Sequence, residues 1–454
     1  MQTNFTPEQL QDPTTAEADR ILRKCVHCGL CTATCPTYVV LGDERDSPRG
    51  RIYAIKDMLE KGIEARPEIT THIDRCLSCF SCMTTCPSGV DYMHLVDIAR
   101  MHIAKTGKRS LKERTLRRAL AKVVPYPGRF RWALKAAPLG RGLAGVFRRV
   151  GLSELSALAA LAPVRSRGRA RYSGPGTAVT QGDRTARVIM LAGCAQQVLR
   201  PEINDATIRL LARSGVEVVV SAGAGCCGAL TQHIGMEEEA LTAARRNVDA
   251  WSKEIAKAPV DAIIITASGC GTTVKDYGHM LARDPAYKDR AAEISALALD
   301  VTEFVARHDI GAPKRWSSLK VAYHAACSLQ HGQRVTHQPK TLLRNAGFSL
   351  LDIPEAHLCC GSAGVYNILQ PEIAGTLRDR KAAHIRGLRP DIVAAGNIGC
   401  MTQLQPALDI PVVHTVELLD WAYGGPVPRG LEGLEQYSTP VPQARLAATG
   451  SGAR

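Results

Sequence analysis

No stretch of this sequence is apolar for long enough to cross a membrane as a helix, which would take about 18 residues. The longest charge-free stretch, residues 392–408, is interrupted by asparagine, glutamine and proline. Residues 1–20 carry four acidic side chains and no apolar segment, so they do not resemble an export signal. We therefore expect a cytoplasmic protein without a membrane-spanning helix.

The sequence also lacks the common signatures of nucleotide and acyl chemistry. It contains no P-loop, no nucleophile elbow and no recognisable flavin site. Gly140-x-Gly142-x-x-Gly145 formally matches a dinucleotide fingerprint, but we expect no strand before it, and no acidic residue lies about 20 positions further on. Because nothing in the chain is expected to remove a hydride, we expect no catalysis by this chain alone.

Cysteine, by contrast, is abundant, because the chain of 454 residues has 16 of them. Without an export signal these thiols are expected to meet the reducing conditions of the cytosol, where disulfides are rare. A chain of this length can also bury a full core without covalent cross-links. The cysteines therefore favour metal binding over disulfide formation.

Eight of the cysteines form two copies of the motif C-x2-C-x2-C-x3-C-P. The copies are Cys25, Cys28, Cys31 and Cys35, and Cys76, Cys79, Cys82 and Cys86. This spacing is typical of domains with two 4Fe–4S clusters, in which the fourth cysteine of each motif ligates the other cluster. We therefore assign one cluster to Cys25, Cys28, Cys31 and Cys86, and the other to Cys76, Cys79, Cys82 and Cys35. Two zinc ribbons are the alternative, and two complete motifs ending in Cys-Pro favour the clusters.

The insert between the two motifs has 40 residues, more than a minimal ferredoxin needs. Residues 52–61 have a helical pattern, so we predict an α-helical ferredoxin domain over residues 1–105. Arg49 and Arg51 lie in this insert. We expect them on the surface, either in contact with a partner or simply solvated.

The other eight cysteines form an internal repeat. Its copies are Cys194, Cys226, Cys227 and Cys270, and Cys327, Cys359, Cys360 and Cys400. In both copies 31 residues separate the first cysteine from the adjacent pair, and glycine follows the pair. This equal spacing predicts two related domains, over residues 187–315 and 316–425.

Each copy contains three short apolar, β-branched runs, each followed by a loop and then by a helical pattern. The runs are residues 188–191, 216–220 and 262–266, and then 319–323, 348–353 and 392–395. Such runs are typical of parallel strands covered by helices on both faces. We therefore predict an α+β multidomain fold, with a helical ferredoxin domain followed by two tandem α/β CCG repeats. Their cysteines should lie past the carboxyl ends of the strands, where open α/β sheets bind ligands.

Each cysteine quartet of the repeat is a candidate site for a soft metal or a further cluster, because several thiols would meet at one sheet edge. Buried structural cysteines are the alternative. His324 and His414 are expected at strand ends near the quartets, as candidates for proton transfer or quinone contact, or as hydrogen-bonded structural residues. His27 lies within the first cluster motif, whose ligand set the cysteines already complete.

Positive charge is concentrated in one part of the chain. Residues 101–171 contain 18 Lys and Arg against two acids, whereas the whole chain has a net charge of +14. Apolar residues such as Phe130 and Trp132 accompany them. We predict a basic helical or linker segment over 106–186, and peripheral contact of residues 101–171 with the anionic inner face of the cell membrane. No nucleic-acid recognition fold is present, so we expect no nucleic-acid partner. Residues 426–454 are expected to form a flexible tail.

The paired cluster motifs, the segment Asp46-Ser-Pro-Arg-Gly-Arg-Ile52 and the two CCG repeats together resemble the iron–sulfur subunit of bacterial glycolate oxidase. The likeness extends from residue 15 to about residue 425, and segments 323–332 and 358–367 are its most specific parts. The resemblance implies an electron-transfer subunit whose partner subunits carry FAD and oxidise glycolate to glyoxylate, with D-lactate as a second candidate substrate. It also implies quinone as the electron acceptor.

Two kinds of alternative function remain. Iron–sulfur subunits of glycerol-3-phosphate dehydrogenases and lactate-utilisation systems share the same parts. A self-contained CCG-type reductase, with substrate chemistry at a CCG cluster, is the other. Related heterodisulfide reductases close each repeat with C-x-x-C, whereas this chain has Thr273 and Gln403 at the last position. The missing fifth cysteine of each repeat disfavours the reductase.

Overall fold

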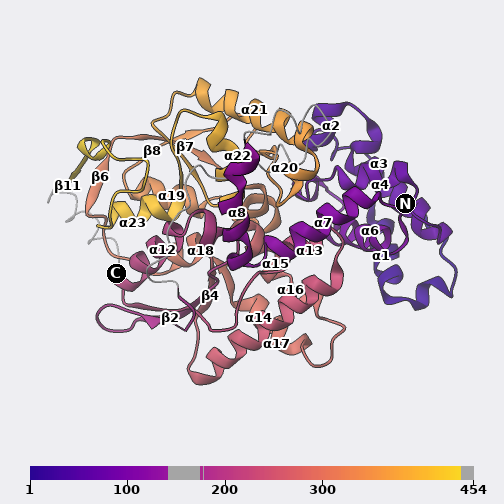
Figure 1. The fold of residues 1–454 in the computed structure, drawn as a ribbon, viewed down its shortest axis with the longest axis horizontal. Helices are drawn as coiled ribbons and strands as arrows, with labels where there is room; N and C mark the ends of the chain where they lie inside the picture. The colour runs from indigo at the N-terminus through magenta and orange to yellow at the C-terminus, as the bar shows by residue number, and fades with distance from the viewer. Residues whose placement is uncertain (142–173, 177, 441–454) are drawn as a thin grey trace.

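The computed structural model describes residues 1–141, 174–176 and 178–440. Gly142 and Gly145 of the glycine fingerprint, residues 142–171 of the basic segment and residues 441–454 of the expected tail lie outside the described residues. In Figure 1 the N-terminal helices gather on one side of the molecule, and the two repeats form the other. None of the described helices is both long and apolar enough to cross a membrane.

The N-terminal domain is built from short helices. They are α1 (Pro13–Lys24), α2 (Pro36–Leu41), α3 (Pro48–Lys61), α4 (Pro67–Asp74), α5 (Ser81–Thr85) and α6 (Tyr92–Thr106). Proline stands in the first turn of α1 to α4, where its missing N–H would have no partner within the helix. Ile21, Ile55, Met58 and Leu95 are fully buried in the core between these helices. The helix expected over residues 52–61 is therefore present and begins four residues earlier.

Two helices continue the chain into the basic segment, α7 (Leu111–Val123) and α8 (Pro127–Arg141). Part of the positive charge predicted here is compensated within the protein. Arg117 of α7 and Arg109 before it both pair with Asp74 and Glu113, and both arginines are largely buried. The basic face available to a partner is therefore smaller than the sequence count suggests.

Each repeat folds around its own sheet. The first contains β1 (Ala178–Val179), β2 (Ala186–Met190), β3 (Val216–Val219), β4 (Ala262–Ile265) and β5 (Ala298–Asp300), in the order β1-β3-β2-β4-β5. The second contains β7 (Lys320–His324), β8 (Ser349–Asp352), β9 (Ile392–Ala395) and β10 (Val412–His414), in the order β10-β9-β7-β8. All pairs are parallel except β1 with β3. Without β1, the two sheets have the same strand order, as a repeat requires.

Helices cover both sheets. In the first repeat they are α11 (Gln196–Leu199), α12 (Glu202–Arg213), α13 (Ala229–His233), α14 (Glu237–Lys257), α15 (Ser268–Lys275), α16 (Tyr277–Met280), α17 (Lys288–Leu297) and α18 (Val301–Arg307). In the second they are the π-helix η3 (Ser328–Gly332), α19 (Gln338–Asn345), α20 (Tyr366–Leu369), α21 (Pro371–Gly387), α22 (Ile398–Leu404) and α23 (Thr415–Ala422).

The two repeats share one hydrophobic core, to which Val188 and Leu211 of the first and Val321 and Leu418 of the second all belong. Helices α12 and α23 lie side by side across their boundary, where two arginines of α12 pair with the buried Asp420 of α23. The two repeats are therefore packed against each other through a shared core and through ion pairs.

The chain beyond residue 425 differs from the expected flexible tail as far as residue 440. Strand β11 (Ser438–Pro440) pairs with β6 (Arg315–Ser317), and Leu431 is fully buried. Proline, glycine and alanine made this stretch look unstructured, but Leu431, with the partly buried Val427 and Leu434, packs against the hydrophobic core, and β11 pairs with β6.

Candidate functional site

The two cluster motifs form loops of the same shape. The first loop turns through His27 (φ 57°) and Gly29 (φ 85°), and the second through Ser78 (φ 49°) and Phe80 (φ 60°), at the same two motif positions. Left-handed backbone is uncommon for residues other than glycine, and for a bulky aromatic residue it persists only when the surroundings impose it. Alternating turns of this kind direct backbone N–H groups toward the inside of a loop, where they suit an anionic group.

Each loop borders a cavity lined by cysteines. The first cavity is lined by Cys25, Cys28, Cys31, Cys82 and Cys86, and the second by Cys35, Cys76, Cys79 and Cys82. The fourth cysteine of each motif therefore lies at the cavity of the other motif, as crossed ligation requires. Pro48, Cys82 and Tyr92 line both cavities, so the two cavities adjoin. The assignment of individual ligands stays a prediction.

The environment of these thiols fits a metal cluster. Burial raises the pKa of Cys79 and Cys82 well above the usual range and, with the neighbouring Cys25, raises the pKa of Cys31 to about 11. Without a metal these three side chains are protonated thiols at neutral pH. Metal binding then has to release their protons, which makes assembly of the site dependent on pH.

Arg51 was expected at the surface, and that expectation is wrong, because its side chain is only 1% exposed. Its guanidinium donates to the carbonyl oxygen of His72 at 2.7 Å, to Thr37 at 3.0 Å and to Asp46 at 3.3 Å, and it lies 3.8 Å from the sulfur of Cys35. The sequence singled out Arg51 only by its place in the insert between the motifs, because the contacts that bury it come from the fold. Arg49, in contrast, is about one-third exposed and pairs with Glu44.

Tyr92 is a second site residue that the sequence did not single out. It is buried at the start of α6, lines both cavities and donates from its hydroxyl to the sulfur of Cys76 at 3.8 Å. Hydrogen bonds to a cysteine ligand tune a cluster, so Tyr92 and Arg51 both stand where they would do so.

The eight cysteines of the repeat gather into two quartets at the carboxyl ends of the strands. In the first quartet, Cys194 contacts Cys226, and the adjacent Cys227 contacts Cys270. Hydrogen bonds from Cys194 and Cys227 lower the pKa of Cys226 well below its usual range. The first quartet therefore contains one thiol that is readily ionised.

The second quartet has the same chain of contacts. The sulfurs of Cys327 and Cys359 lie 3.7 Å apart, and Cys360 contacts Cys400. The first cysteine of each quartet thus meets the first of the CC pair, and the last meets the second.

The second quartet adjoins the second cluster cavity. Leu77 and Cys79 of the ferredoxin domain pack in one hydrophobic cluster with Cys359 and Tyr366, and Cys327 lies against it. Around this contact Thr84 hydrogen-bonds to His331 at 2.7 Å. The three cysteine sites therefore follow one another, from the first cavity to the second and on to the second quartet.

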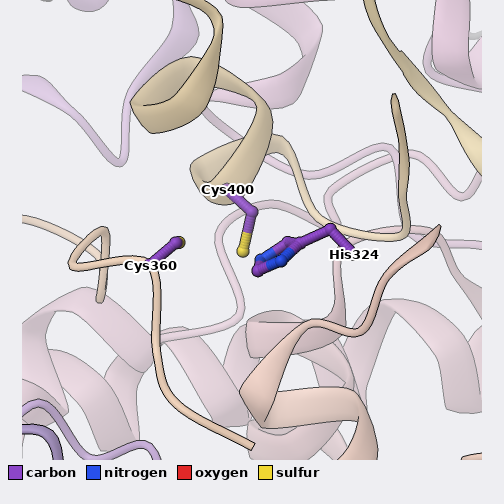
Figure 2. Close-up of side chains that lie close together, drawn as sticks. All are labelled: His324, Cys360 and Cys400. Atoms are coloured by element: carbon purple, nitrogen blue, oxygen red, sulfur yellow. The ribbon is translucent and has the colours of Figure 1, made fainter. Parts of the chain in front are cut away.

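The three histidines singled out from the sequence differ in their surroundings. The Nε2–H of His414 donates to the carbonyl oxygen of Thr266 at 2.8 Å, and its Nδ1 accepts from the amide of Val416, so it is a hydrogen-bonded structural residue. The Nε2 atoms of His27 and His324 are buried without a hydrogen-bond partner. In Figure 2 the ring of His324 points toward the sulfur of Cys400, with Cys360 opposite.

Comparisons with known proteins agree with this geometry. The cysteine-rich domain family matches residues 188–275 and 321–405, and the 4Fe-4S dicluster domain family matches residues 21–90. The second match confirms the prediction of two 4Fe–4S clusters in the N-terminal domain.

Similar proteins cover most of the chain. It is 43% identical to the glycolate oxidase iron-sulfur subunit of Escherichia coli (strain K12), over 93% of this chain and 99% of that protein. It is 30% identical to a probable glycolate oxidase iron-sulfur subunit of Bacillus subtilis (strain 168), over 89% and 94%. A crystal structure of a hypothetical protein from Helicobacter pylori matches with a TM-score of 0.53 at 10% identity, over 93% of this chain and 74% of that one, which shows the fold alone.

Proposed function

The chain belongs to the family of glycolate oxidase iron–sulfur subunits, and on that premise we propose that it receives electrons from flavin-containing partner subunits that oxidise glycolate to glyoxylate and passes them toward quinone. Oxidation of a 2-hydroxy acid moves two electrons and needs a two-electron acceptor such as a flavin. Each 4Fe–4S cluster, when bound, takes up and releases one electron. The chain is therefore the part of the complex that conducts electrons and does not itself act on the substrate.

The observation that supports this proposal most directly is the shared wall between the two cysteine cavities. Cys82 and Tyr92 line both of them, so two bound groups would be near neighbours. The first cavity also faces outward at Cys28, which is exposed, whereas Cys76, Cys79 and Cys82 of the second are buried. We propose that electrons enter from the flavin subunits at the exposed Cys28 side and move inward.

The positions of the missing fifth cysteines, both within the described residues, do not favour a self-contained reductase. Thr273 and Gln403, which stand at the missing cysteine positions, make hydrogen bonds within the protein, to Gly269 and to Asn367 and Ala374 respectively. Hydrogen bonds of this kind, to neighbouring residues of the protein, are typical of structural side chains.

The test measures glycolate-dependent reduction of a quinone analogue by the purified chain, by its flavin-containing partner subunits, and by both together. We expect turnover to the quinone analogue only with both present, and loss of that turnover in Cys25→Ser and Cys79→Ser. The partners should still reduce their own flavin with glycolate. Turnover of glycolate by the isolated, flavin-free chain would overturn the proposal, and a preference for D-lactate or glycerol 3-phosphate would reassign the substrate.

A further inference from the structure

His324 is the last residue of β7 and faces the second cysteine quartet. Cys360 lies in the loop after β8, and Cys400 lies in the first turn of α22, directly after β9. The three side chains thus come from the carboxyl ends of three neighbouring strands, β8, β7 and β9. A ring nitrogen of His324 and the sulfurs of Cys360 and Cys400 all lie within 4.8 Å of one another, and all three residues are buried.

A buried imidazole without a partner is costly, because its nitrogen loses water and gains no hydrogen bond. His324 is 2% exposed, and its Nε2 has no hydrogen-bond partner. His414, the other buried histidine at a strand end of this repeat, does have its nitrogens satisfied. A metal ion bound between the two sulfurs and the Nε2 atom of His324 would satisfy this nitrogen as well.

Two neighbours of the quartet suit anionic thiolates rather than neutral thiols. Lys381 is 2% exposed, and its ammonium donates to the carbonyl oxygen of Glu355, so its charge needs an anion nearby. The carboxylate of Glu355 also acts on this charge but is already paired with Arg380 and His384, so the sulfurs of Cys359 and Cys360 are further groups that could balance it. Asn397 donates from its amide to the sulfur of Cys400 at 3.6 Å. Metal-bound cysteines are thiolates and would supply the missing negative charge.

The first repeat has no equivalent of this histidine. Position 191, three residues before Cys194, corresponds to position 324, three residues before Cys327, and it holds a buried leucine. The two quartets have the same cysteines and the same chain of contacts, so this substitution changes the ligand chemistry of one quartet alone.

We infer that the second repeat holds a metal centre in which His324 ligates the metal together with Cys360 and Cys400, and that the first repeat lacks this imidazole ligand. Mixed thiolate and imidazole ligands suit zinc and iron. The three ligand atoms lie within 4.8 Å of one another, and ligands of one tetrahedral zinc ion are about 4 Å apart. An iron–sulfur cluster with one histidine ligand uses the same donors. His324 would then take the place of the absent fifth cysteine in this repeat only.

The test uses the full chain, purified without oxygen, and measures zinc, iron and sulfide per chain together with the ligands of the bound metal. X-ray absorption at the zinc edge, or pulsed electron paramagnetic resonance of an iron centre, detects a coordinated nitrogen directly. The variants are His324→Leu, which copies the first repeat, His324→Cys, which keeps a ligand, and His414→Leu as the control for loss of a buried histidine. Circular dichroism verifies that each variant is folded.

In the parent protein we expect more metal than the roughly eight irons that two 4Fe–4S clusters hold. We also expect a nitrogen ligand on that additional metal. His324→Leu should lose that additional metal, zinc if the centre is a single ion and iron with sulfide if it is a cluster, while the two cubanes remain. His324→Cys should keep the metal and lose the nitrogen signal, and His414→Leu should keep both. The inference fails if the parent shows no metal beyond the cubanes, or if the metal and its nitrogen signal persist in His324→Leu.

Discussion

At the scale of single residues, Arg51 and Asp46 form a buried ion pair beside the second cluster cavity. Asp46 is fully buried and also contacts His72 at 3.0 Å and Arg75 at 2.9 Å. Removing one partner of a buried pair leaves an uncompensated charge and typically costs about 3–5 kcal/mol.

We predict that Arg51→Met lowers the free energy of unfolding by about 3 kcal/mol, at the lower end of that range because Arg75 and His72 still contact Asp46. Chemical denaturation of the anaerobic protein measures this loss. Arg45→Met is the matched control, since its pair with Asp43 is exposed and should contribute at most about 1 kcal/mol. Equal losses in the two variants would show that burial does not set the cost.

Cys35 tests the crossed assignment of ligands, because it belongs to the first motif by sequence and to the second cavity by position. We predict that Cys35→Ser changes the electron paramagnetic resonance signal of the cluster bound mainly by the second motif and leaves the other signal in place. Cys28→Ser should do the reverse, since Cys28 lines only the first cavity. If Cys35→Ser altered only the first-motif cluster, each motif would supply all four ligands of its own cluster.

At the scale of elements, the apolar runs predicted the strands, and the equal cysteine spacing predicted the two repeats. Both signals can be read from short stretches of the sequence. All six predicted strands are present, and none of their ends is shifted by more than two residues. The fourth strands, β5 and β10, were not predicted, because each has only three residues and runs directly into a helix. The helices that follow them begin in the same way, because Asp300 and His414 cap α18 and α23 with matching capping boxes.

The contacts between distant elements could not be predicted in the same way. Cys79 and Cys359 are 280 residues apart in the chain, and nothing in their local sequence indicates that they meet. The burial of Arg51 depends on three segments that only the fold brings together. Motif spacing thus identifies ligands, whereas the groups that tune the ligands come from tertiary packing.

Helix α8 carries the part of the predicted membrane contact that can be tested on described residues. Trp132 is 73% exposed, and the ammonium of Lys135 lies over its ring at 4.9 Å. An exposed tryptophan among basic residues suits the surface of an anionic membrane, where each basic side chain contributes about 1 kcal/mol.

We predict that Lys135→Glu weakens binding to phosphatidylserine vesicles by about 10- to 30-fold at low salt, because one attraction is lost and one repulsion is gained. Co-sedimentation at low and high salt measures the change. Lys253→Glu, an equal charge reversal at an exposed position of α14, is the control and should bind like the parent. Binding that ignores both salt and Lys135→Glu would exclude an electrostatic contact through α8.

At the scale of the whole molecule, the ferredoxin domain contacts both repeats, and the two contacts differ in kind. Against the second repeat it packs Leu77 and Cys79 in an apolar cluster. Against the first repeat it places charged and titratable groups, with Glu17 bonded to His279 at 2.6 Å and His94 to Asp276 at 3.0 Å. The rings of His94 and His279 stack with their centres 3.6 Å apart. The apolar contact joins the second cluster cavity to the second quartet, and the polar one should respond to pH.

The pKa of His94 gives the direction in which this boundary should respond to pH. Burial alone lowers the pKa of His94, but hydrogen bonds to Asp276 and Asp91 outweigh it and raise the pKa to about 10. A folded-state pKa above the unfolded value of about 6.5 means that the stabilisation is complete below about pH 6.5 and is lost as the pH rises toward 10. Urea unfolding from pH 6 to 10 should therefore show His94→Gln to be less stable than the parent at low pH, with the difference shrinking as the pH rises. His102→Gln is the control for loss of an imidazole without an ion pair, because the ring of His102 bonds to the carbonyl oxygen of Ile63 within its own domain. A constant difference for His94→Gln would mean that the imidazole is neutral at this boundary and that its contact with Asp276 does not depend on charge.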